Sequence, residues 1–554
     1  MGRVYARTAV APSMYPRIDP ARVGERVRYQ AGPALKEDKL KEKDRKKRTP
    51  PTAAQKVKFT LRGVVITGAT VFSPAELRPF YANYIGKRVN LIELQKIADA
   101  ITVKYRNAGY IVSRAVIPAQ KIRNGIVYIK VIEGFVGNVR IEGDPKGTRT
   151  LLRTYGSKLQ QTWPPLRMKK LERYVLLTED LPGIDVQTIL TPSENIPGAT
   201  DVTLIVDHQK FDADVALNNF GTRYLGPVQI SATAMVNTLI GADQLGFRAV
   251  STPFNNEMRF FQLFYNRPLG SSGMRLDIEG DYTRTKPGFI IGYMDMKGNA
   301  EAFRVKLSYP FIRSRHQNFN ANISFKFLNS ETVYLGEPLY QDHIRPLRIG
   351  AYYTLLDRWQ GFNFISAQFS KGLPIWNASK RKGNKYPKSR SDGRSDYLKY
   401  DAYISRLQKF SQRVNLLLAA DGQYSNFPLL SAEEFGYGGR IFGQGYDPSE
   451  IVGDSGMAGK AELRFDTFPG YKALKFIQYY ALYSIGRIWN LGDNDQNQVV
   501  SAASTGVGML IHFTDYISGR LEVDKPLTYP VQTQIDAGKN GNAWRGFFSL
   551  TAYL

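Results

Sequence analysis

From residue 209 to the end of the chain, apolar and polar residues alternate with a period of two. Residues 319–327 place Phe, Ala, Ile, Phe and Phe at odd positions, and Asn, Asn, Ser and Lys between them. The same alternation recurs at 274–279, 303–308, 460–466 and 520–524. Because neighbouring side chains of a strand face opposite sides, each segment has one apolar face and one face with charges of both signs. Many such strands in succession favour a barrel with a lipid-facing exterior and a wet interior.

The pattern contains sixteen such segments, and the last of them reaches the final residue. They lie near 211–219, 227–238, 244–252, 257–268, 273–284, 299–310, 318–328, 346–356, 362–371, 396–408, 412–424, 457–467, 473–487, 500–513, 516–526 and 545–554. An even number of strands returns the C-terminus to the side where the barrel began. We therefore predict a membrane β-barrel of 16 antiparallel strands over residues 209–554.

Upstream of the barrel the apolar spacing changes to that of small α+β units. In residues 58–134 a helix over 91–107 is predicted by apolar residues at helical spacing; they are Leu91, Leu94, Ile97, Ala98, Ile101 and Tyr105. Gly109 ends this helix, and the Asn124-Gly125 pair is typical of a tight turn. The remaining elements are predicted at 59–67 (strand), 73–84 (helix), 112–118 (strand) and 126–132 (strand).

Residues 135–208 form a second predicted unit of the same class. A strand over 136–142 leads to a helix over 169–177, which Pro182-Gly183 ends. Two strands follow, over 184–190 and 202–206.

Residues 1–57 are rich in Pro, Lys and Arg. Asp19 and Pro20 are suited to start a helix over 18–30, and residues 31–57 are typical of a solvated tether. The alternative is a disordered tail with a chance helix. The segment MGRVYARTAV has no apolar stretch behind it. Either a leader has been removed or the protein never enters a secretory route, and we expect the first.

Composition excludes several classes of function. The chain has no Cys and only 4 His, which excludes a thiol nucleophile, a disulfide framework and a Cys/His metal site. The net charge of +26 first suggests nucleic acid, but no helix-turn-helix, zinc finger or aromatic RNA-binding motif accompanies it. We expect no nucleic-acid partner, catalytic residue, cofactor or metal.

One basic cluster lies inside the predicted barrel region. Residues 371–396 hold 8 Lys and Arg against 2 Asp and Glu, and strand parity places them outside the cell. Anionic outer-membrane lipid, including lipopolysaccharide phosphate, is the predicted partner. The alternative is a solvated loop.

The sequence resembles that of the two-partner-secretion outer-membrane transporters (TpsB family, of the haemolysin and filamentous-haemagglutinin secretion-activation type) over about 58–554. The sequence motif of their POTRA domains is matched by Ser113-Arg114, Pro118, Gln120, Gly125 and Glu133-Gly134. Leu181-Pro182-Gly183 with Pro197-Gly198 is similar to their second POTRA domain, and 218–227 to their first hairpin.

The resemblance implies an outer-membrane pore that exports a large β-helical adhesin or haemolysin-like partner from the periplasm. POTRA 1 would span 58–134 and POTRA 2 would span 135–208. The helix at 18–30 would plug the pore, with Arg22, Arg26 and Arg28 meeting carboxylates such as Glu279 or Glu462. We expect a monomer. Alternatives are a barrel-assembly factor of the same superfamily and, more distantly, a porin or a soluble binding module.

The resemblance also implies that loop 425–456 folds back into the pore. Its motif positions are held by Gly438, Gly439, Gly443, Gln444, Gly445, Tyr446, Gly453, Asp454 and Gly456. In the family an Arg of this motif pairs with an Asp on the barrel wall. Here Gln444 replaces the Arg and Ser484, two residues before Gly486, replaces the Asp. We predict a neutral Gln444–Ser484 hydrogen bond, with Arg440 or Arg487 as alternative carriers of the charge.

Unfolded partner protein is expected to dock on POTRA 1 by adding a strand to its sheet. The groove beside the second strand and second helix suggests four candidate residues: Ile97, Tyr105, Arg114 and Val116. The identity of the exported partner is not encoded in this chain.

Overall fold

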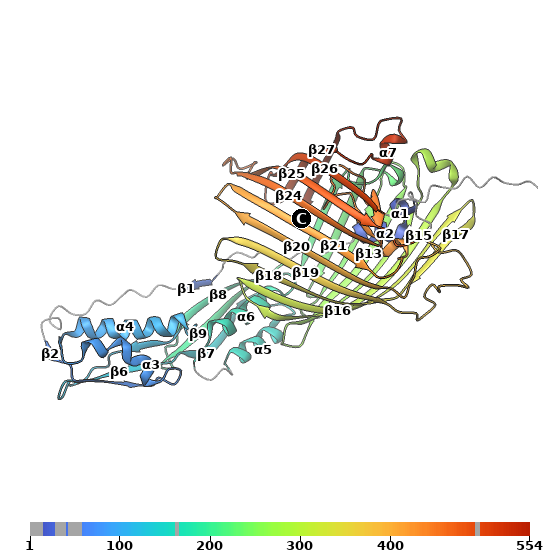
Figure 1. The fold of residues 1–554 in the computed structure, drawn as a ribbon. Helices are drawn as coiled ribbons and strands as arrows, with labels where there is room; N and C mark the ends of the chain where they lie inside the picture. Colours follow the sequence, from blue (N-terminus) through green and yellow to red (C-terminus); the bar gives the residue numbers. More distant parts are fainter. Residues whose placement is uncertain (1–14, 28–39, 43–57, 161–164, 493–498) are drawn as a thin grey trace, which may run out of the picture.

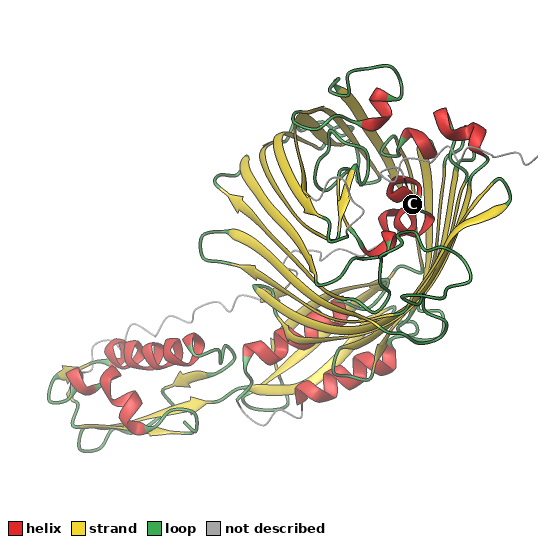
Figure 2. Cartoon of the chain, turned by 45° about the vertical axis from the view of Figure 1, so that its right-hand side comes forward, coloured by secondary structure: helices red, strands yellow, loops and turns green. Residues whose placement is uncertain are grey.

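The computed structural model describes residues 15–27, 40–42, 58–160, 165–492 and 499–554. Two α+β units lie in line and lead into one end of a closed β-barrel (Figure 1). The view in Figure 2 shows helices and loops inside the barrel, which is therefore not an empty tube.

The first unit is a three-stranded sheet packed against one long helix. The helix α4 (Leu91–Asn107) is capped by Asn90, whose side chain accepts a hydrogen bond from the Glu93 N–H at 3.1 Å. It ends before Gly109, whose φ is +90°. Strand β6 pairs parallel with β3 and antiparallel with β5. The elements are β2 Phe59–Thr60, β3 Gly63–Thr67, α3 Pro74–Leu77, η3 Arg78–Phe80, η4 Ala82–Tyr84, β4 Arg88–Val89, α4 Leu91–Asn107, β5 Arg114–Val116 and β6 Ile126–Ile132.

Two of the predicted elements in this unit are wrong in detail. The helix expected over 73–84 is one α-helical turn followed by two 3-10 turns, because Pro79 has no N–H to continue an α-helix. The strand expected over 59–67 divides into β2 and β3, which pair with different partners. The helix over 91–107 is confirmed.

The second unit has the same two layers and one helix that the sequence did not reveal. Its elements are β7 Phe135–Gly143, α5 Arg149–Gln160, α6 Met168–Glu179, β8 Ile184–Pro192 and β9 Ala199–His208. The missed helix α5 contains Gly156, a poor helix former, which lets the helix approach Val139: a Cβ at residue 156 would lie 3.0 Å from it. A short strand β1, Leu40–Glu42, pairs with the edge of β8 within the segment expected to be a tether.

The barrel confirms the predicted sixteen antiparallel strands. Strands β17 and β18 pair with the two halves of β16 and together act as one strand of the closure. The described barrel strands are β10 Phe211–Asn218, β11 Gln229–Asn237, β12 Gln244–Ser251, β13 Met258–Leu269, β14 Met274–Thr285, β15 Lys297–Arg313, β16 Gln317–Tyr334, β17 Glu337–Ile344, β18 Pro346–Leu356, β19 Gly361–Gly372, β20 Leu398–Lys409, β21 Val414–Ser425, β24 Ser455–Thr467, β25 Phe476–Trp489, β26 Val499–His512, β27 Ile517–Pro526 and β28 Arg545–Tyr553.

The first and last strands close the barrel. Strands β10 and β28 pair over five residues, from Asp214 with Tyr553 to Asn218 with Ser549. Asn219 extends the seam, since its side chain donates to the Gly546 carbonyl at 2.9 Å and accepts from the Phe548 N–H at 2.8 Å. Three of the connections between barrel strands contain a short helix; these helices are η5 Arg223–Leu225, η6 Phe289–Met294 and α7 Gln532–Ile535.

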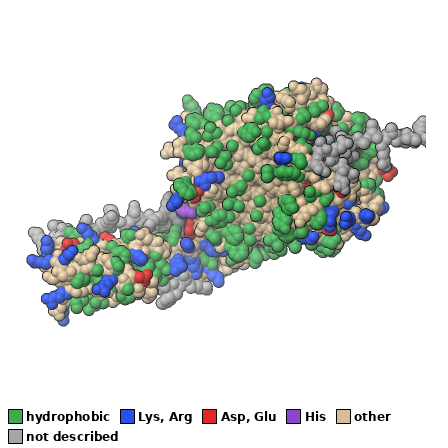
Figure 3. Space-filling view, in the orientation of Figure 1, with side chains coloured by type: hydrophobic (Ala, Val, Ile, Leu, Met, Phe, Trp, Pro, Cys, Tyr) green, Lys and Arg blue, Asp and Glu red, His purple; other side chains and the backbone are tan. Residues whose placement is uncertain are grey.

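The outer wall is apolar, as Figure 3 shows over much of the barrel. Large hydrophobic residues point outward from successive strands; examples are Phe303, Ile349, Leu463, Ile485, Val507 and Leu521. Among the described residues no helix has the length and apolar character needed to cross a bilayer.

Candidate translocation pore

Two short helices from the N-terminus lie in the lumen (Figure 1). They are α1 Tyr15–Ile18 and α2 Pro20–Val27. The Asp19 carboxylate caps α2 by accepting the Ala21 N–H at 2.8 Å, which confirms the cap predicted from the sequence. Ile18 and Val23 are buried against Phe260 on β13. Residues 28–30 of the predicted helix lie outside the described residues.

The helices are held chiefly by charged contacts to the loop that folds into the barrel. The Arg17 guanidinium lies 2.9 Å from the Glu450 carboxylate, and both side chains are almost fully buried. Arg22 donates to the carbonyls of Ser431 (2.5 Å) and Glu434 (3.0 Å). Arg26 donates to the Pro448 carbonyl at 2.9 Å.

These contacts correct the expected partners of the plug arginines. Arg22 and Arg26 turn to the loop and not to the wall carboxylates, so the prediction for them is wrong. Glu279 bonds Arg304 on the next strand, and Glu462 bonds Arg464 on its own strand. These wall carboxylates are already paired with cations of the same or the adjoining strand, because charges of both signs lie on the lumen face of the wall. Arg28 lies outside the described residues.

The loop 425–456 enters the lumen and packs on the wall, as the resemblance implied. It contains η7 Ser431–Glu433 and a small hairpin of β22 Phe435–Tyr437 and β23 Ile451–Gly453. Its aromatic residues form a buried cluster with small residues of the barrel strands; the cluster includes Phe435, Tyr437, Phe442, Tyr446, Ala419, Ala458 and Ala502.

Glycines at two places make this close packing possible. Gly438 and Gly439 follow β22 with φ of +118° and +103°, which other residues rarely adopt. On the wall, a Cβ at residue 486 would lie 2.3 Å from the Tyr437 ring. The Gly486 retained from the family pattern therefore leaves room for the loop's aromatic side chain.

Ser484 contacts the loop, but not through Gln444. Its hydroxyl accepts hydrogen bonds from the Gly443 N–H (3.0 Å) and the Tyr437 hydroxyl (3.3 Å) and donates to the Gly459 carbonyl (3.1 Å). Gln444 instead donates to the carbonyls of Arg440 and Ile441, both at 3.3 Å. The predicted Gln444–Ser484 bond is wrong by one residue, because the backbone of Gly443, and not the side chain of Gln444, reaches Ser484.

Ion pairs do attach the loop to the barrel, but they involve other residues than the Arg–Asp pair that the family resemblance implied. Asp447 pairs with Arg545 on the closing strand β28. Asp454 lies 2.6 Å from Arg390, which also reaches Glu434 at 2.9 Å. Sequence reasoning missed these pairs, although the loop carries five acidic residues; they are Glu433, Glu434, Asp447, Glu450 and Asp454.

A third anchor lies on the opposite wall. Glu433, which is buried, lies 2.6 Å from Arg348 on β18 and 2.8 Å from Lys399 on β20. Each carboxylate of the loop is thus matched by cations that the barrel or α1 presents, as buried charges require.

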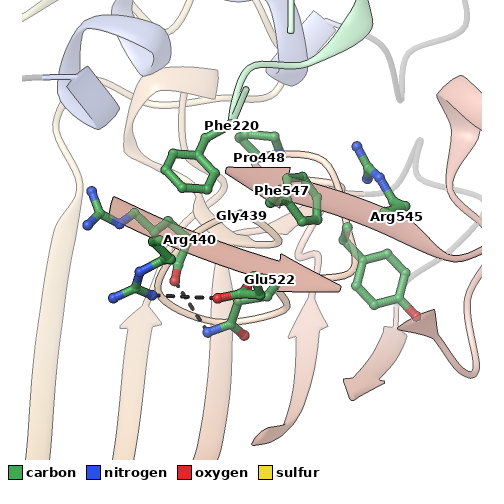
Figure 4. Close-up of a pocket in the computed structure, with 10 residues that line it drawn as sticks. Phe220, Gly439, Arg440, Pro448, Glu522, Arg545 and Phe547 are labelled. Carbon is green, nitrogen blue, oxygen red and sulfur yellow. Dashed lines mark hydrogen bonds and ion pairs between the residues drawn. The ribbon is translucent and has the colours of Figure 1, made fainter. Parts of the chain in front are cut away.

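The two arginines proposed as substitutes do not form these anchors. Arg440 lies over the Phe220 ring, 5.4 Å from its centre, in a small pocket beside the seam that Glu522 and Phe547 also line (Figure 4). Arg487 lies 5.5 Å from the centre of the Trp489 ring.

The basic loop between β19 and β20 lies at the barrel end opposite the α+β units (Figure 1). Lys380, Arg381, Lys382 and Lys385 are exposed. Arg390 is turned inward to Asp454 and is not available to an external phosphate. Contact with lipopolysaccharide therefore remains a prediction for the exposed residues only.

The four docking candidates in the first unit separate into two pairs. Ile97 and Tyr105 are 1% and 0% exposed in its core, so neither presents a surface to a partner. Arg114 and Val116 lie on β5, at the edge of the sheet, and are partly exposed. The Ala115 N–H between them donates to the Thr102 hydroxyl of α4 at 2.9 Å.

The observed bonds of Ser484 predict which residues are energetically coupled. Ser484→Ala removes a hydroxyl with three buried partners, and we expect it to destabilise the barrel by about 1–3 kcal/mol. In double-mutant cycles followed by heat-induced unfolding in detergent, Ser484→Ala should couple to Tyr437→Phe and be additive with Gln444→Ala. Ser501→Ala, on the exposed face of β26, is the matched control. Coupling to Gln444 alone would contradict the observed register.

Comparisons with known proteins agree with this architecture. The haemolysin secretion/activation protein ShlB/FhaC/HecB family matches residues 198–509, and the ShlB-type POTRA domain matches residues 59–134. The heme/hemopexin transporter protein HuxB of Haemophilus influenzae is 22% identical over 474 residues, covering 85% of this chain and 83% of HuxB. The outer membrane transporter CdiB of Escherichia coli is 23% identical over 491 residues, covering 85% and 79%.

Solved structures share the fold. CdiB from Escherichia coli matches with a TM-score of 0.72 at 21% identity, covering 91% of this chain and 93% of that structure. BamA from Haemophilus ducreyi, in a form lacking POTRA domains 1–3, matches with a TM-score of 0.52 at 12% identity, covering 90% and 99%.

Proposed function

The chain belongs to the haemolysin secretion/activation (ShlB/FhaC/HecB) family, and we propose that it exports one large adhesin-like or haemolysin-like partner protein in an extended form. It is an outer-membrane translocation pore of two-partner secretion, with its POTRA domains in the periplasm. The relatives HuxB and CdiB are named as a heme/hemopexin transporter protein and an outer membrane transporter. A barrel-assembly role is the weaker alternative, because the family match is to the secretion proteins.

The observation that carries this proposal is a lumen occupied by two elements that do not belong to the hydrogen-bonded strands of the wall. Helices α1 and α2 are held in the lumen by side-chain contacts, mainly to the loop 425–456. The loop 425–456 is attached at both ends but touches the wall through ion pairs and an aromatic cluster. Displacing both elements would open a path, whereas the wall itself is closed by backbone hydrogen bonds.

We propose that residues 15–27 act as a removable plug and that residues 58–134 receive the partner at the β5 edge. An incoming extended segment would pair with β5 and take over the Ala115 N–H now bonded to Thr102. Arg114 and Val116 would flank that contact. Transport would be driven by folding of the partner outside the cell, and we expect no catalytic step.

The test is export of a repeat-rich partner encoded next to this chain. In cells lacking this chain, the partner should accumulate in the periplasm, and the full chain supplied in trans should restore it to the surface. Antibody binding and protease accessibility on whole cells would measure how much partner protein is displayed at the surface. Unchanged display without this chain would contradict the proposal, whereas misassembly of unrelated outer-membrane barrels would favour the assembly role.

A further inference from the structure

The second α+β unit (residues 135–208) carries a strongly basic pair of helices beside the barrel rim. Helices α5 and α6 hold six Lys and Arg against two Glu. The six basic residues, here called the basic helix face, are Arg149, Arg153, Lys158, Lys169, Lys170 and Arg173. Figure 3 shows Lys and Arg side chains gathered where this unit meets the barrel.

The two acidic residues of these helices do not neutralise the exposed surface. Glu172 accepts the Arg315 N–H of the β15–β16 turn at 2.8 Å, so its carboxylate faces the barrel rim. Glu179 is buried. Arg149, Arg153, Lys158 and Lys169 are exposed, and the outward charge of the helix pair is therefore positive.

Contacts of Arg173 place this face at the lipid-facing wall. Its guanidinium donates to the carbonyls of Ser272 (2.9 Å) and Phe311 (3.3 Å) at the barrel rim. It also lies 6.0 Å from the centre of the Tyr309 ring. Tyr309 lies on the same outward face of β15 as Phe303. Phe311 lies at the bulge between Pro310 and Ile312 and is 58% exposed.

The aromatic residues at this rim have the position expected of an interfacial girdle. The Tyr309 and Phe311 ring centres are 4.9 Å apart, and those of Phe311 and Phe319 are 5.8 Å apart. Aromatic girdles lie at the headgroup level of outer-membrane barrels. Because Arg173 packs on this group from the periplasmic side, the basic helix face lies next to the headgroups of the inner leaflet.

We propose that the basic helix face docks on anionic phospholipid headgroups in the periplasmic leaflet of the outer membrane. Continuity with the lipid-facing wall favours lipid over an acidic segment of the exported partner, because the partner's path leads into the lumen and Arg173 lies outside it. The contact holds the second unit at a fixed angle beneath the pore entrance.

The charges within the face are consistent with an anionic occupant. Burial and the neighbouring Lys158 ammonium both lower the pKa of Lys170. An anion placed between these lysines offsets their mutual repulsion, and each basic residue near an anionic surface adds favourable binding energy.

Lysine acylation of the full chain in nanodiscs tests this contact. Nanodiscs of phosphatidylethanolamine alone are compared with nanodiscs that also contain phosphatidylglycerol, and modification is followed by mass spectrometry. We expect acylation of Lys158, Lys169 and Lys170 to slow about fivefold with phosphatidylglycerol and to recover at high salt. Lys87 and Lys121, exposed on the first unit, should react equally in both.

A charge-reversal variant separates lipid docking from other causes. Lys146, which is exposed and lies three residues before α5, should also be protected by phosphatidylglycerol. This protection should disappear in Lys158→Glu/Lys169→Glu/Lys170→Glu, whereas Lys87→Glu/Lys121→Glu should retain it. Equal acylation rates in both lipids would overturn the proposal. Protection that appears only after unfolded partner protein is added would also overturn it and assign the face to cargo.

Discussion

Deletion of residues 58–134 is expected to abolish surface display of the partner protein while the barrel remains in the outer membrane. The deleted unit has its own core, centred on Leu94, Ile101 and Val127, which is separate from the clusters inside the barrel. The second unit keeps its own anchor to the barrel, since Asp180 bonds Arg313 at 2.7 Å. Loss of the docking site without loss of the pore should leave the partner in the periplasm.

Fractionation and heat-modifiability on gels would verify barrel assembly, and protease accessibility in whole cells would measure display. The edge contact is tested more finely by Arg114→Ala/Val116→Ala, which should reduce export partially. The matched control is Lys121→Ala/Ile122→Ala, in the exposed connection between β5 and β6. Normal export by the deletion would contradict docking on this unit.

Removal of residues 1–30 is expected to raise the ion conductance of the barrel strongly while export continues. Helix α2 contacts the lumen faces of β14, β15 and β16, so its loss opens volume in the pore. It also removes Arg17 from Glu450, and an unpaired buried carboxylate is costly. The loop should therefore loosen, which adds to the increase in conductance.

Single-channel recording in planar bilayers would measure this effect. Deletion of residues 1–14 alone, which leaves α1 and α2 in place, is the matched control and should conduct like the intact chain. Adding Glu450→Gln to the larger deletion removes the unpaired charge and separates loss of the plug from loosening of the loop. Equal conductance of the two deletions would mean that the helices do not obstruct the pore.

The barrel was predictable because lipid outside and water inside impose a local rule on every strand. The strand predicted over 346–356 is β18 to the residue. The strand predicted over 318–328 is β16, which runs on to Tyr334. The extension pairs with β17. It was not predicted, because the alternation of apolar and polar residues used to find the strands was recognised only as far as residue 328.

The candidate site was predictable only in outline. The glycine-rich sequence motif identified the loop that enters the lumen, and Asp19 identified the start of α2. The partners of the charged residues were not predictable, since Arg17 and Glu450 are separated by 433 positions in the chain. Likewise, Gly443 and not Gln444 meets Ser484, because the twist of the loop sets which atom reaches the wall.

The sequence by itself determined the elements whose signal is local: the alternating strands, the capped helix α4 and the glycines where backbone approaches backbone. Only the tertiary structure decided which charges pair, which strand lies at the edge of a sheet and which arginine contacts the barrel rim. The physical reason is that periodicity and capping depend on residues a few positions apart. Ion pairs and docking surfaces depend on where the closed barrel brings distant segments together.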